Sequence, residues 1–234
     1  MMRISAQLAQ VRESSAEAAR GAGRAPESVT LLAVSKTFGP EAVIEAADAG
    51  QREFGENYVQ EALDKIAAVK ARRPDLDLIW HFIGPLQSNK TRPVAEQVDW
   101  VHSVDRLKIA QRLSDQRPDS LPPLNICLQV NVSGEASKSG VAPEELPALA
   151  SAVTGLPRLR LRGLMAIPEP EDDPVLQRRP FALLWDLQQQ LSADGILTDT
   201  LSMGMSADMA AAIAEGATVV RIGTAIFGQR DYAK

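Results

Sequence analysis

Cysteine, histidine and aromatic residues are all scarce in this sequence of 234 residues. It contains one cysteine, Cys127, which excludes an internal disulfide bond and is expected to be a small buried residue. One cysteine and two histidines, His81 and His102, provide too few ligands for a zinc cluster. No apolar run approaches the roughly 20 residues that cross a bilayer, and the polar N-terminus has no signal-peptide core. We therefore expect a cytoplasmic protein with no membrane partner.

An excess of positive charge is also missing. The sequence has 25 Lys+Arg and 30 Asp+Glu, a formal net charge of −5. Such a chain has no overall positive field with which to hold a phosphate backbone, so nucleic acid is not an expected partner. A few arginines and backbone amides could still hold one small anion.

The composition is that of a folded globular protein, with 45% hydrophobic and 24% charged residues. Eight short apolar or β-branched segments predict strands. They are Val29–Ser35, Arg52–Gly55, Leu78–Ile83, Trp100–Ser103, Leu124–Asn131, Leu159–Ala166, Thr200–Met203 and Thr218–Ile222. Several are almost continuously apolar, as parallel strands covered on both faces are.

Segments of helical character separate these strands. They are Pro40–Ala49, Asn57–Ala71, Asn89–Gln97, Arg106–Asp115, Pro143–Thr154, Pro180–Ala193 and Ser206–Glu215. Ile4, Leu8 and Val11 lie at helical spacing and predict a further helix within residues 1–24, packed on the rest. The alternation favours one α/β domain over residues 1–234, a single (β/α)8 TIM-type barrel with an extra N-terminal helix, over a doubly wound sheet.

Lys36 directly follows the apolar run LLAVS, at the end of the first predicted strand. Active sites of such barrels lie at this carboxyl-terminal rim. A solvated lysine at a strand end is one interpretation of Lys36. The other is a lysine that forms a Schiff base, because partial burial in a barrel mouth lowers a lysine pKa and frees the amine to attack an aldehyde.

Two glycine-containing segments follow the seventh and eighth strands. Gly204 and Gly223 let backbone N–H groups approach an anion, Ser206 could cap the next helix, and Thr224 could add a hydroxyl. Either segment alone is equally explained by helix capping. Their neighbouring positions in barrel order favour a phosphate site, which recurs there in this fold.

Three further residues have both a structural and a functional interpretation. Arg221, inside the last apolar strand, either contacts a ligand or pairs with a strand-end acid such as Glu53 or Glu56. Asn57 either caps a helix or touches a ligand. His81 is a satisfied core histidine or a catalytic base, and the structural interpretation is favoured.

Two loops could border the site. The proline-rich segment Ile167–Pro180 predicts a long loop after the sixth strand, which could cover a ligand. The polar segment 131–140 follows the fifth strand and could bind an anion through Lys138, although a plain surface loop is an equal alternative.

Seven stretches together resemble the pyridoxal phosphate homeostasis protein family of the YggS/PROSC type, which is related in fold to the barrel domain of alanine racemase. They are LLAVSK, FGENYVQEA, WHFIGPLQSNK, NVSGEASKSG, LRGLMAIPE, LSMGMSADM and VRIGTAIFG, in the family's order and spacing. One departure is Phe38, where relatives often carry a basic or polar residue. The resemblance implies a fold type III barrel that binds pyridoxal 5′-phosphate (PLP).

The resemblance also implies the roles of individual residues. Lys36 would hold PLP as an internal aldimine, with Asn57 and Arg221 near the ring. The phosphate would lie around Ser206, Gly223 and Thr224, and Ser202 and Met205 are further cofactor-binding candidates. The implied role is vitamin B6 homeostasis, in which the protein buffers PLP or delivers it, with PLP-dependent apo-enzymes as candidate recipients. We expect a monomer.

We expect binding without robust catalytic turnover. Alanine racemase uses a tyrosine from a second domain opposite its lysine, and here the last strand and its turn end at Gly228, so no second domain is expected to follow. The tyrosines are Tyr58, at a helix start, and Tyr232, near the tail. Two alternatives remain, a PLP-dependent racemase or lyase with an unidentified substrate, and a Schiff-base aldolase acting on a phosphorylated sugar.

Overall fold

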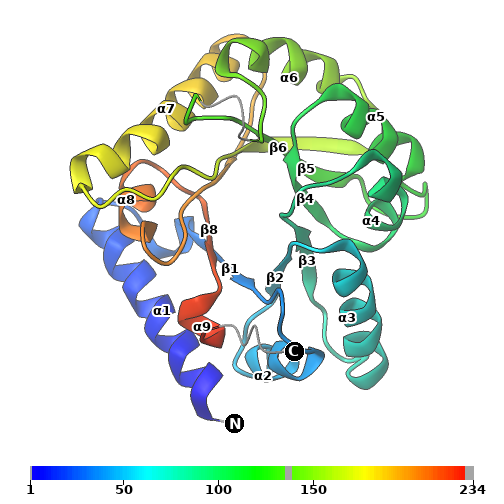
Figure 1. Ribbon diagram of the computed structural model, residues 1–234, viewed down its shortest axis with the longest axis vertical. Coiled ribbons are helices and arrows are strands. Elements are labelled where there is room, and N and C mark those ends of the chain that lie inside the picture. Colours follow the sequence, from blue (N-terminus) through cyan, green and yellow to red (C-terminus); the bar gives the residue numbers. More distant parts are fainter. Residues whose placement is uncertain (1, 135–138, 230–234) are drawn as a thin grey trace.

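Eight parallel strands form a closed barrel in which each strand pairs with the next and β8 pairs with β1 (Figure 1). The computed structural model describes residues 2–134 and 139–229. The strands are β1 (Thr30–Val34), β2 (Glu53–Glu56), β3 (Ile79–Phe82), β4 (Trp100–Val104), β5 (Leu124–Gln129), β6 (Leu159–Met165), β7 (Thr200–Ser202) and β8 (Val219–Ile222). Each overlaps a predicted strand, so the predicted barrel is confirmed.

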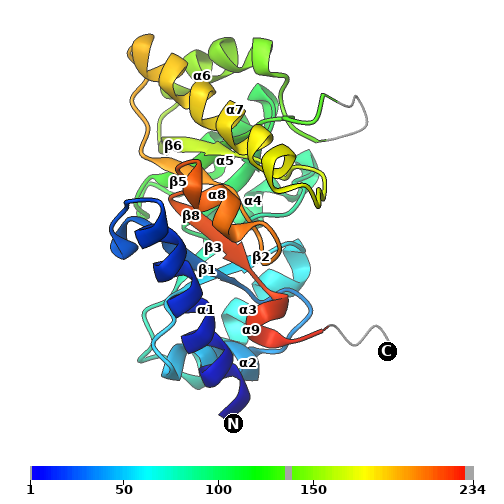
Figure 2. The same cartoon turned by 90° about the vertical axis from the view of Figure 1, so that its left-hand side faces the viewer.

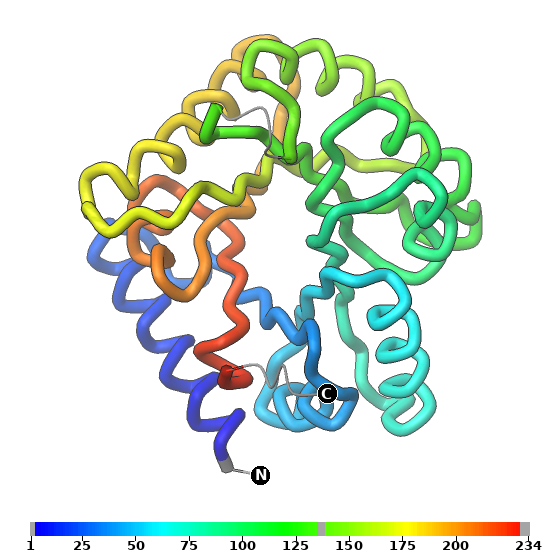
Figure 3. The backbone as a smooth tube through the Cα atoms, viewed as in Figure 1, coloured from blue at the N-terminus to red at the C-terminus, as the bar shows by residue number. Residues whose placement is uncertain are grey.

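Helices surround the barrel on the outside (Figures 1 and 3). The α-helices are α1 (Met2–Gly21), α2 (Pro40–Asp48), α3 (Val59–Arg72), α4 (Thr91–Gln97), α5 (Leu107–Gln116), α6 (Leu146–Thr154), α7 (Pro174–Ala193), α8 (Met209–Ala214) and α9 (Thr224–Phe227). Single-turn 3₁₀ helices are η1 (Pro26–Ser28), η2 (Ser88–Lys90) and η3 (Pro143–Glu145). None of the helices in the described ranges is both long and apolar enough to span a membrane.

The extra helix α1 lies along α8 and α9, beside the last strand (Figure 2). Its apolar side chains Leu8 and Val11 are buried, as their helical spacing predicts. Just beyond the helix, Arg24 Nη1 donates to the carbonyl oxygen of Ile213 at 2.8 Å. The N-terminal helix thus covers the side of the barrel where the chain closes between β8 and β1.

The barrel interior has an apolar part and a polar part. Leu32 and Val34 of β1 pack with Ile83 and Val219 in a cluster separate from the main core. Ala33, which lies between the first two, belongs to the core between the strands and helices, so the alternation of β1 places Leu32 and Val34 inside the barrel. Across the interior lie buried polar side chains, which include those of His81, His102, Ser202 and Arg221.

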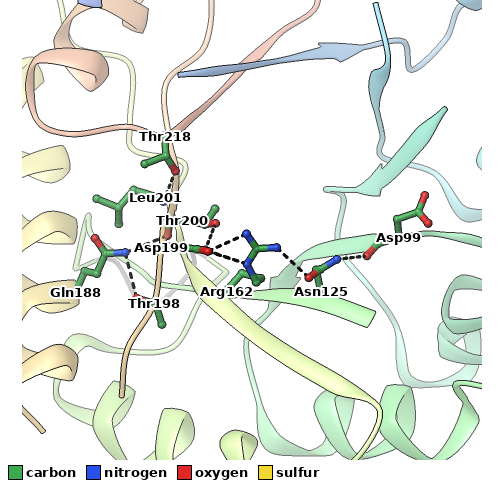
Figure 4. Close-up of polar contacts among 9 residues, drawn as sticks. All are labelled: Asp99, Asn125, Arg162, Gln188, Thr198, Asp199, Thr200, Leu201 and Thr218. Atoms are coloured by element: carbon green, nitrogen blue, oxygen red, sulfur yellow. Dashed lines mark hydrogen bonds and ion pairs between the residues drawn. The ribbon is translucent and has the colours of Figure 1, made fainter. Parts of the chain in front are cut away.

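A polar network ties the amino-terminal ends of several strands together (Figure 4). Arg162 of β6 pairs with Asp199, just before β7, at 2.8 Å and donates to Asn125 Oδ1 of β5 at 3.1 Å. The Arg162 guanidinium also lies 4.6 Å from the ring centroid of Trp100 in β4. These contacts close the barrel at the end opposite to Lys36.

The long loop predicted over Ile167–Pro180 is wrong in its second half. Helix α7 already begins at Pro174, because Asp173 caps it by accepting from the amides of Val175 at 2.8 Å and Leu176 at 3.3 Å. Pro180 lies inside this helix rather than before it. The connection after β6 is therefore short, running from Ala166 to Asp173.

The Cys127 thiol is fully buried in β5, as predicted, and burial raises its pKa to about 12. A thiolate is the reactive form of cysteine, so the native protein is expected to resist thiol reagents at neutral pH. The check is reaction with an aromatic disulfide reagent, which should modify about one thiol per chain only after denaturant is added. Rapid stoichiometric labelling of the native protein would contradict this burial.

Candidate functional site

Lys36 lies two residues after β1, at the carboxyl-terminal mouth of the barrel. Alternation along the strand continues the inward positions Leu32 and Val34 to Lys36, which places its side chain over the mouth. The residue is half-buried. This is where the sequence predicts a lysine that can reach a ligand held between the strand ends.

A buried ion cluster holds the backbone on both sides of Lys36. The Lys65 ammonium, from α3, donates to the carbonyl oxygen of Ser35 at 2.7 Å, to Glu56 Oε1 at 2.6 Å and to Glu61 Oε1 at 2.9 Å. Ser35 Oγ donates to the same Glu56 oxygen at 2.5 Å. The amide of Thr37 donates to Glu61 Oε1 at 2.5 Å. All three ammonium donors are used, and the residues flanking Lys36 are fixed to α3 and β2.

Two features show that this cluster is under electrostatic and conformational constraint. Thr37 has φ +70°, a conformation unusual for a residue other than glycine. Burial raises the pKa of the Glu56 carboxyl, an effect that the neighbouring Lys65 charge opposes. Lys65 and Glu56 come from different elements and show no motif of their own, so the sequence does not predict this cluster.

Asn57 follows β2 beside this cluster, and its predicted role as a helix cap is wrong. The cap position of α3 is Tyr58, without a side-chain capping bond. Asn57 Oδ1 is buried and has no hydrogen-bond partner within the described residues. A Cβ on Gly84 would lie only 2.0 Å from the backbone oxygen of Asn57. Only glycine therefore allows the chain after β3 to lie this close to the backbone of Asn57. Asn57 therefore presents a buried acceptor at the mouth.

Arg221 is buried inside the barrel, as predicted, but its partners are not the acids that the sequence suggested. Its Nη1 donates to Ser202 Oγ at 2.9 Å and its Nη2 to the carbonyl oxygen of Ala166 at 2.9 Å. Glu56 pairs with Lys65 instead, and Glu53 contacts His81. Burial lowers the pKa of Arg221 to about 10, so the guanidinium is charged at neutral pH. The two bonds use two of its five N–H donors.

The glycine-containing segments after β7 and β8 meet at the same rim. The amide of Arg221 donates to the carbonyl oxygen of Gly204 at 2.9 Å. Gly204 has φ +95°, and a Cβ there would lie 2.5 Å from that of Ala212. Gly223 precedes α9, and a Cβ on it would lie 3.2 Å from the carbonyl oxygen of Val34 in β1. The last turn thus packs closely against β1, the strand that Lys36 follows.

The remaining candidates of these segments divide into buried and exposed residues. Ser202 is fully buried, whereas Met205, Ser206 and Thr224 are exposed. The predicted role of Ser206 as the cap of α8 is wrong, because Asp208 occupies the cap position. Asp208 Oδ1 accepts from the amide of Met205 at 2.5 Å. The Ser206 hydroxyl is therefore not needed for capping that helix.

Four further residues named from the sequence lie at different places. Phe38, the departure from the family pattern, packs on Phe227 of α9 with ring centroids 5.3 Å apart, so it links the loop after Lys36 to the last turn. Lys138 and Tyr232 lie outside the described residues. Tyr58 is 54% exposed.

Both histidines are buried core residues, which agrees with the structural interpretation of His81. Burial first, and then electrostatic interactions with His81 and Arg221, lower the pKa of His102 well below its usual value of 6.5. The imidazole of His102 therefore binds a proton more readily in the unfolded chain than in the folded protein. The stability that the neutral, buried His102 contributes is present above about pH 6.5 and is lost as the pH falls below that value.

We therefore expect wild-type stability to fall on acidification more steeply than that of the variant His102→Gln. The difference in slope should approach about 1.4 kcal/mol per pH unit, the value for one proton. Urea unfolding at about pH 7.5 and about pH 5.5 measures it. Equal slopes for the two proteins would contradict a neutral, buried His102.

Comparisons with known proteins cover nearly the whole chain. The family described as alanine racemase, N-terminal domain, matches residues 8–231. A pyridoxal phosphate homeostasis protein from Pseudomonas aeruginosa is 64% identical over 232 residues, which are 99% of this chain and 98% of the relative.

Two solved structures are also similar. An unknown protein from Bifidobacterium adolescentis has 36% identity and a TM-score of 0.90, covering 97% of this chain and 95% of its own. PipY of Synechococcus elongatus with PLP bound has 40% identity and a TM-score of 0.80, covering 96% and 100%.

Proposed function

The chain belongs to the pyridoxal phosphate homeostasis protein family, and we propose that it binds PLP at the carboxyl-terminal mouth of its barrel, through Lys36, to buffer or deliver the cofactor. The observation that carries this proposal is the fixed position of Lys36, whose neighbours Ser35 and Thr37 are both bound to the Lys65 cluster. PLP-dependent apo-enzymes are the proposed recipients.

Lys36 would hold PLP through a Schiff base. Its unprotonated Nζ amine would supply the nucleophile for the cofactor aldehyde, with loss of one water. The fixed backbone reduces the number of positions that the lysine side chain samples, which favours attack at one place. Exchange and release follow by the reverse reaction with water or another amine.

The residues at the mouth fit the cofactor. Asn57 Oδ1 is a buried acceptor without a partner in the described chain, and it suits the ring hydroxyl of PLP. The Arg221 guanidinium can only donate, so it suits an unprotonated ring nitrogen. Ser202 contacts Arg221 and holds it in this position.

The phosphate is proposed to lie at the ends of β7 and β8. The exposed Ser206 and Thr224 offer hydroxyls. The backbone amides between Gly223 and Ile226 offer further donors, because Ile226 is the first residue of α9 whose amide donates to a backbone carbonyl oxygen, that of Gly223. Met205 precedes Ser206 in the segment after β7, where its amide donates to Asp208 Oδ1. Net negative charge elsewhere on the protein does not prevent binding, because these donors act only at short range.

The same arrangement favours binding over turnover. PLP withdraws electrons from a bound amino acid most strongly when its ring nitrogen is protonated, and a charged Arg221 facing that nitrogen opposes protonation. Purified protein loaded with PLP is therefore expected to racemise or transaminate amino acids more slowly than roughly 1 s⁻¹, an ordinary enzymatic rate. Faster turnover of any amino acid would favour a racemase or lyase instead.

The absorption spectrum tests the cofactor proposal directly. Protein mixed with PLP should show a visible band that disappears on borohydride reduction, whereas a sugar-phosphate aldolase would stay colourless until its substrate is added. The variant Arg221→Glu should shift this band or speed cofactor exchange, because it replaces a donor to the ring with an acceptor. An unchanged spectrum and exchange rate in this variant would remove Arg221 from the site.

A further inference from the structure

A line of contacts crosses the barrel interior from Arg221 to Glu53. Ser202 Oγ lies 2.9 Å from Arg221 Nη1 and 2.7 Å from His102 Nδ1. His102 Nε2 lies 2.8 Å from His81 Nδ1, and His81 Nε2 lies 3.0 Å from Glu53 Oε2. The five side chains come from β8, β7, β4, β3 and β2.

The two ends of this line lie at opposite mouths of the barrel. Arg221 is near the carboxyl-terminal end of β8, whereas Glu53 is the first residue of β2. The Glu53 side chain is 28% exposed and lines a surface cavity together with Arg12, Glu27 and Arg52. The three groups between the ends are buried. The line therefore joins the proposed cofactor site to solvent on the other side.

The chemistry of the two ends favours one direction for the bonds between them. Arginine only donates, so Ser202 Oγ accepts from Arg221 and its own proton is free to go to His102 Nδ1. An ionised carboxylate only accepts, so His81 Nε2 carries a proton toward Glu53. The bond between the rings then runs from His102 Nε2–H to His81 Nδ1.

In this arrangement both imidazoles are neutral and carry their proton on Nε2. That agrees with the low pKa of His102, which burial keeps uncharged. The contact between His81 and Glu53 has the distance of an ion pair but lacks hydrogen-bond alignment, so it is the weakest link. Trp100 stacks on His81 with ring centroids 5.3 Å apart and holds that ring in place.

We propose that Ser202, His102 and His81 are positioning residues, which hold the Arg221 guanidinium toward the cofactor ring and connect it to the Glu53 carboxylate at the opposite mouth. A histidine pair that served only to fill the core would need neither a fixed direction nor a carboxylate at its end. The inference rests on the proposed PLP site, since Arg221 is the group through which the line reaches the ring.

The histidine tautomers provide a test that needs no cofactor. The chain has two histidines, so nitrogen-15 labelling of histidine reports on this line alone. NMR of the apo-protein near neutral pH should show two neutral rings protonated on Nε2. Addition of PLP should shift the signals of both, including His81, which is separated from Arg221 by two side chains. A ring protonated on Nδ1, or signals unmoved by PLP binding, would overturn the inference.

A matched pair of variants tests the connection to Glu53. Glu53→Gln and Glu27→Gln each remove one negative charge from the same surface cavity, but Glu53 is the one that contacts His81. We expect Glu53→Gln to speed PLP release about threefold to tenfold, because loss of the carboxylate weakens the orientation of His81 and, through the line, that of Arg221. Glu27→Gln should release PLP at the wild-type rate. Equal rates in both variants and wild type would overturn the inference.

Variants of His102 separate positioning from simple core packing. His102→Gln keeps one donor and one acceptor, whereas His102→Leu removes both. The visible band of the PLP complex should move in His102→Leu and stay near its wild-type position in His102→Gln. If both bands stay in place, the line does not act on the ring. If wild-type protein shows no borohydride-sensitive band at all, the PLP site itself fails, whatever the variants do.

Discussion

Replacing Lys36 with alanine is expected to abolish the borohydride-reducible attachment of PLP and the visible band that accompanies it. Lys36 is the amine that strand alternation places over the barrel mouth, and the residues on both sides of it are fixed. Without it the phosphate and ring contacts can still retain PLP, but only reversibly and without a covalent bond. Absorption spectra and intact mass after reduction measure both effects.

The control for this variant is Lys90→Ala, which removes an exposed lysine at the end of η2. It should bind and retain PLP as the wild type does, since it leaves the mouth unchanged. Thermal unfolding should show that Lys36→Ala is folded, because a half-buried strand-end lysine contributes little packing. A folded Lys36→Ala protein with an undiminished reduced adduct would contradict the assignment.

Replacing Lys65 with methionine is expected to produce the largest loss of stability. Lys65 and Glu56 form a salt bridge of 2.6 Å in which both side chains are almost completely buried. Removal of one partner leaves an uncompensated buried charge, which costs about 3–5 kcal/mol of unfolding free energy. The cluster also fixes Ser35 and Thr37, so Lys65→Met should loosen Lys36 and speed PLP exchange. Urea unfolding of the apo-protein and spectroscopic exchange measure the two effects.

The pH dependence of this loss follows from Glu56. Its pKa is already raised by burial, and removal of Lys65 raises it further. A group whose pKa is raised in the folded state contributes its stability at low pH and loses it as the pH rises through the folded-state pKa. The penalty of Lys65→Met should therefore be smaller in acid than at neutral pH.

Arg20→Met is the matched control, because it removes an ion pair with Glu13 in which the side chains are 57% and 64% exposed. Such surface pairs contribute about 0–1 kcal/mol. The double variant Lys65→Met with Glu56→Gln should recover part of the lost stability, since the unpaired charge is gone. A loss no larger than that of Arg20→Met would show that the buried cluster does not stabilise this mouth.

Much of the fold could be predicted from local sequence. The buried parallel strands are short apolar runs, and alternation with amphipathic helices indicates the barrel without any knowledge of tertiary contacts. Element boundaries were less accurate where a single cap decides them. Capping by Asp173 lets α7 begin at Pro174, six residues before the predicted start at Pro180, and the cap position of α8 is Asp208 rather than Ser206.

The support of the site could not be predicted, because it depends on contacts between distant segments. Lys36 and the glycine turns are visible in sequence as residues at strand ends. The Lys65 cluster joins positions 30 residues apart, and the bond between His102 and Ser202 joins positions 100 residues apart. Neither has a periodic or motif signal, so each becomes apparent only when the barrel brings the strands together.

Peptide mapping of the reduced complex tests the central claim most directly. Protein loaded with PLP would be treated with borohydride, digested and analysed by mass spectrometry. The proposed function predicts one phosphopyridoxyl group per chain, carried by the peptide that contains Lys36. An adduct found mainly on another lysine, or no adduct on a protein that binds PLP, would contradict it.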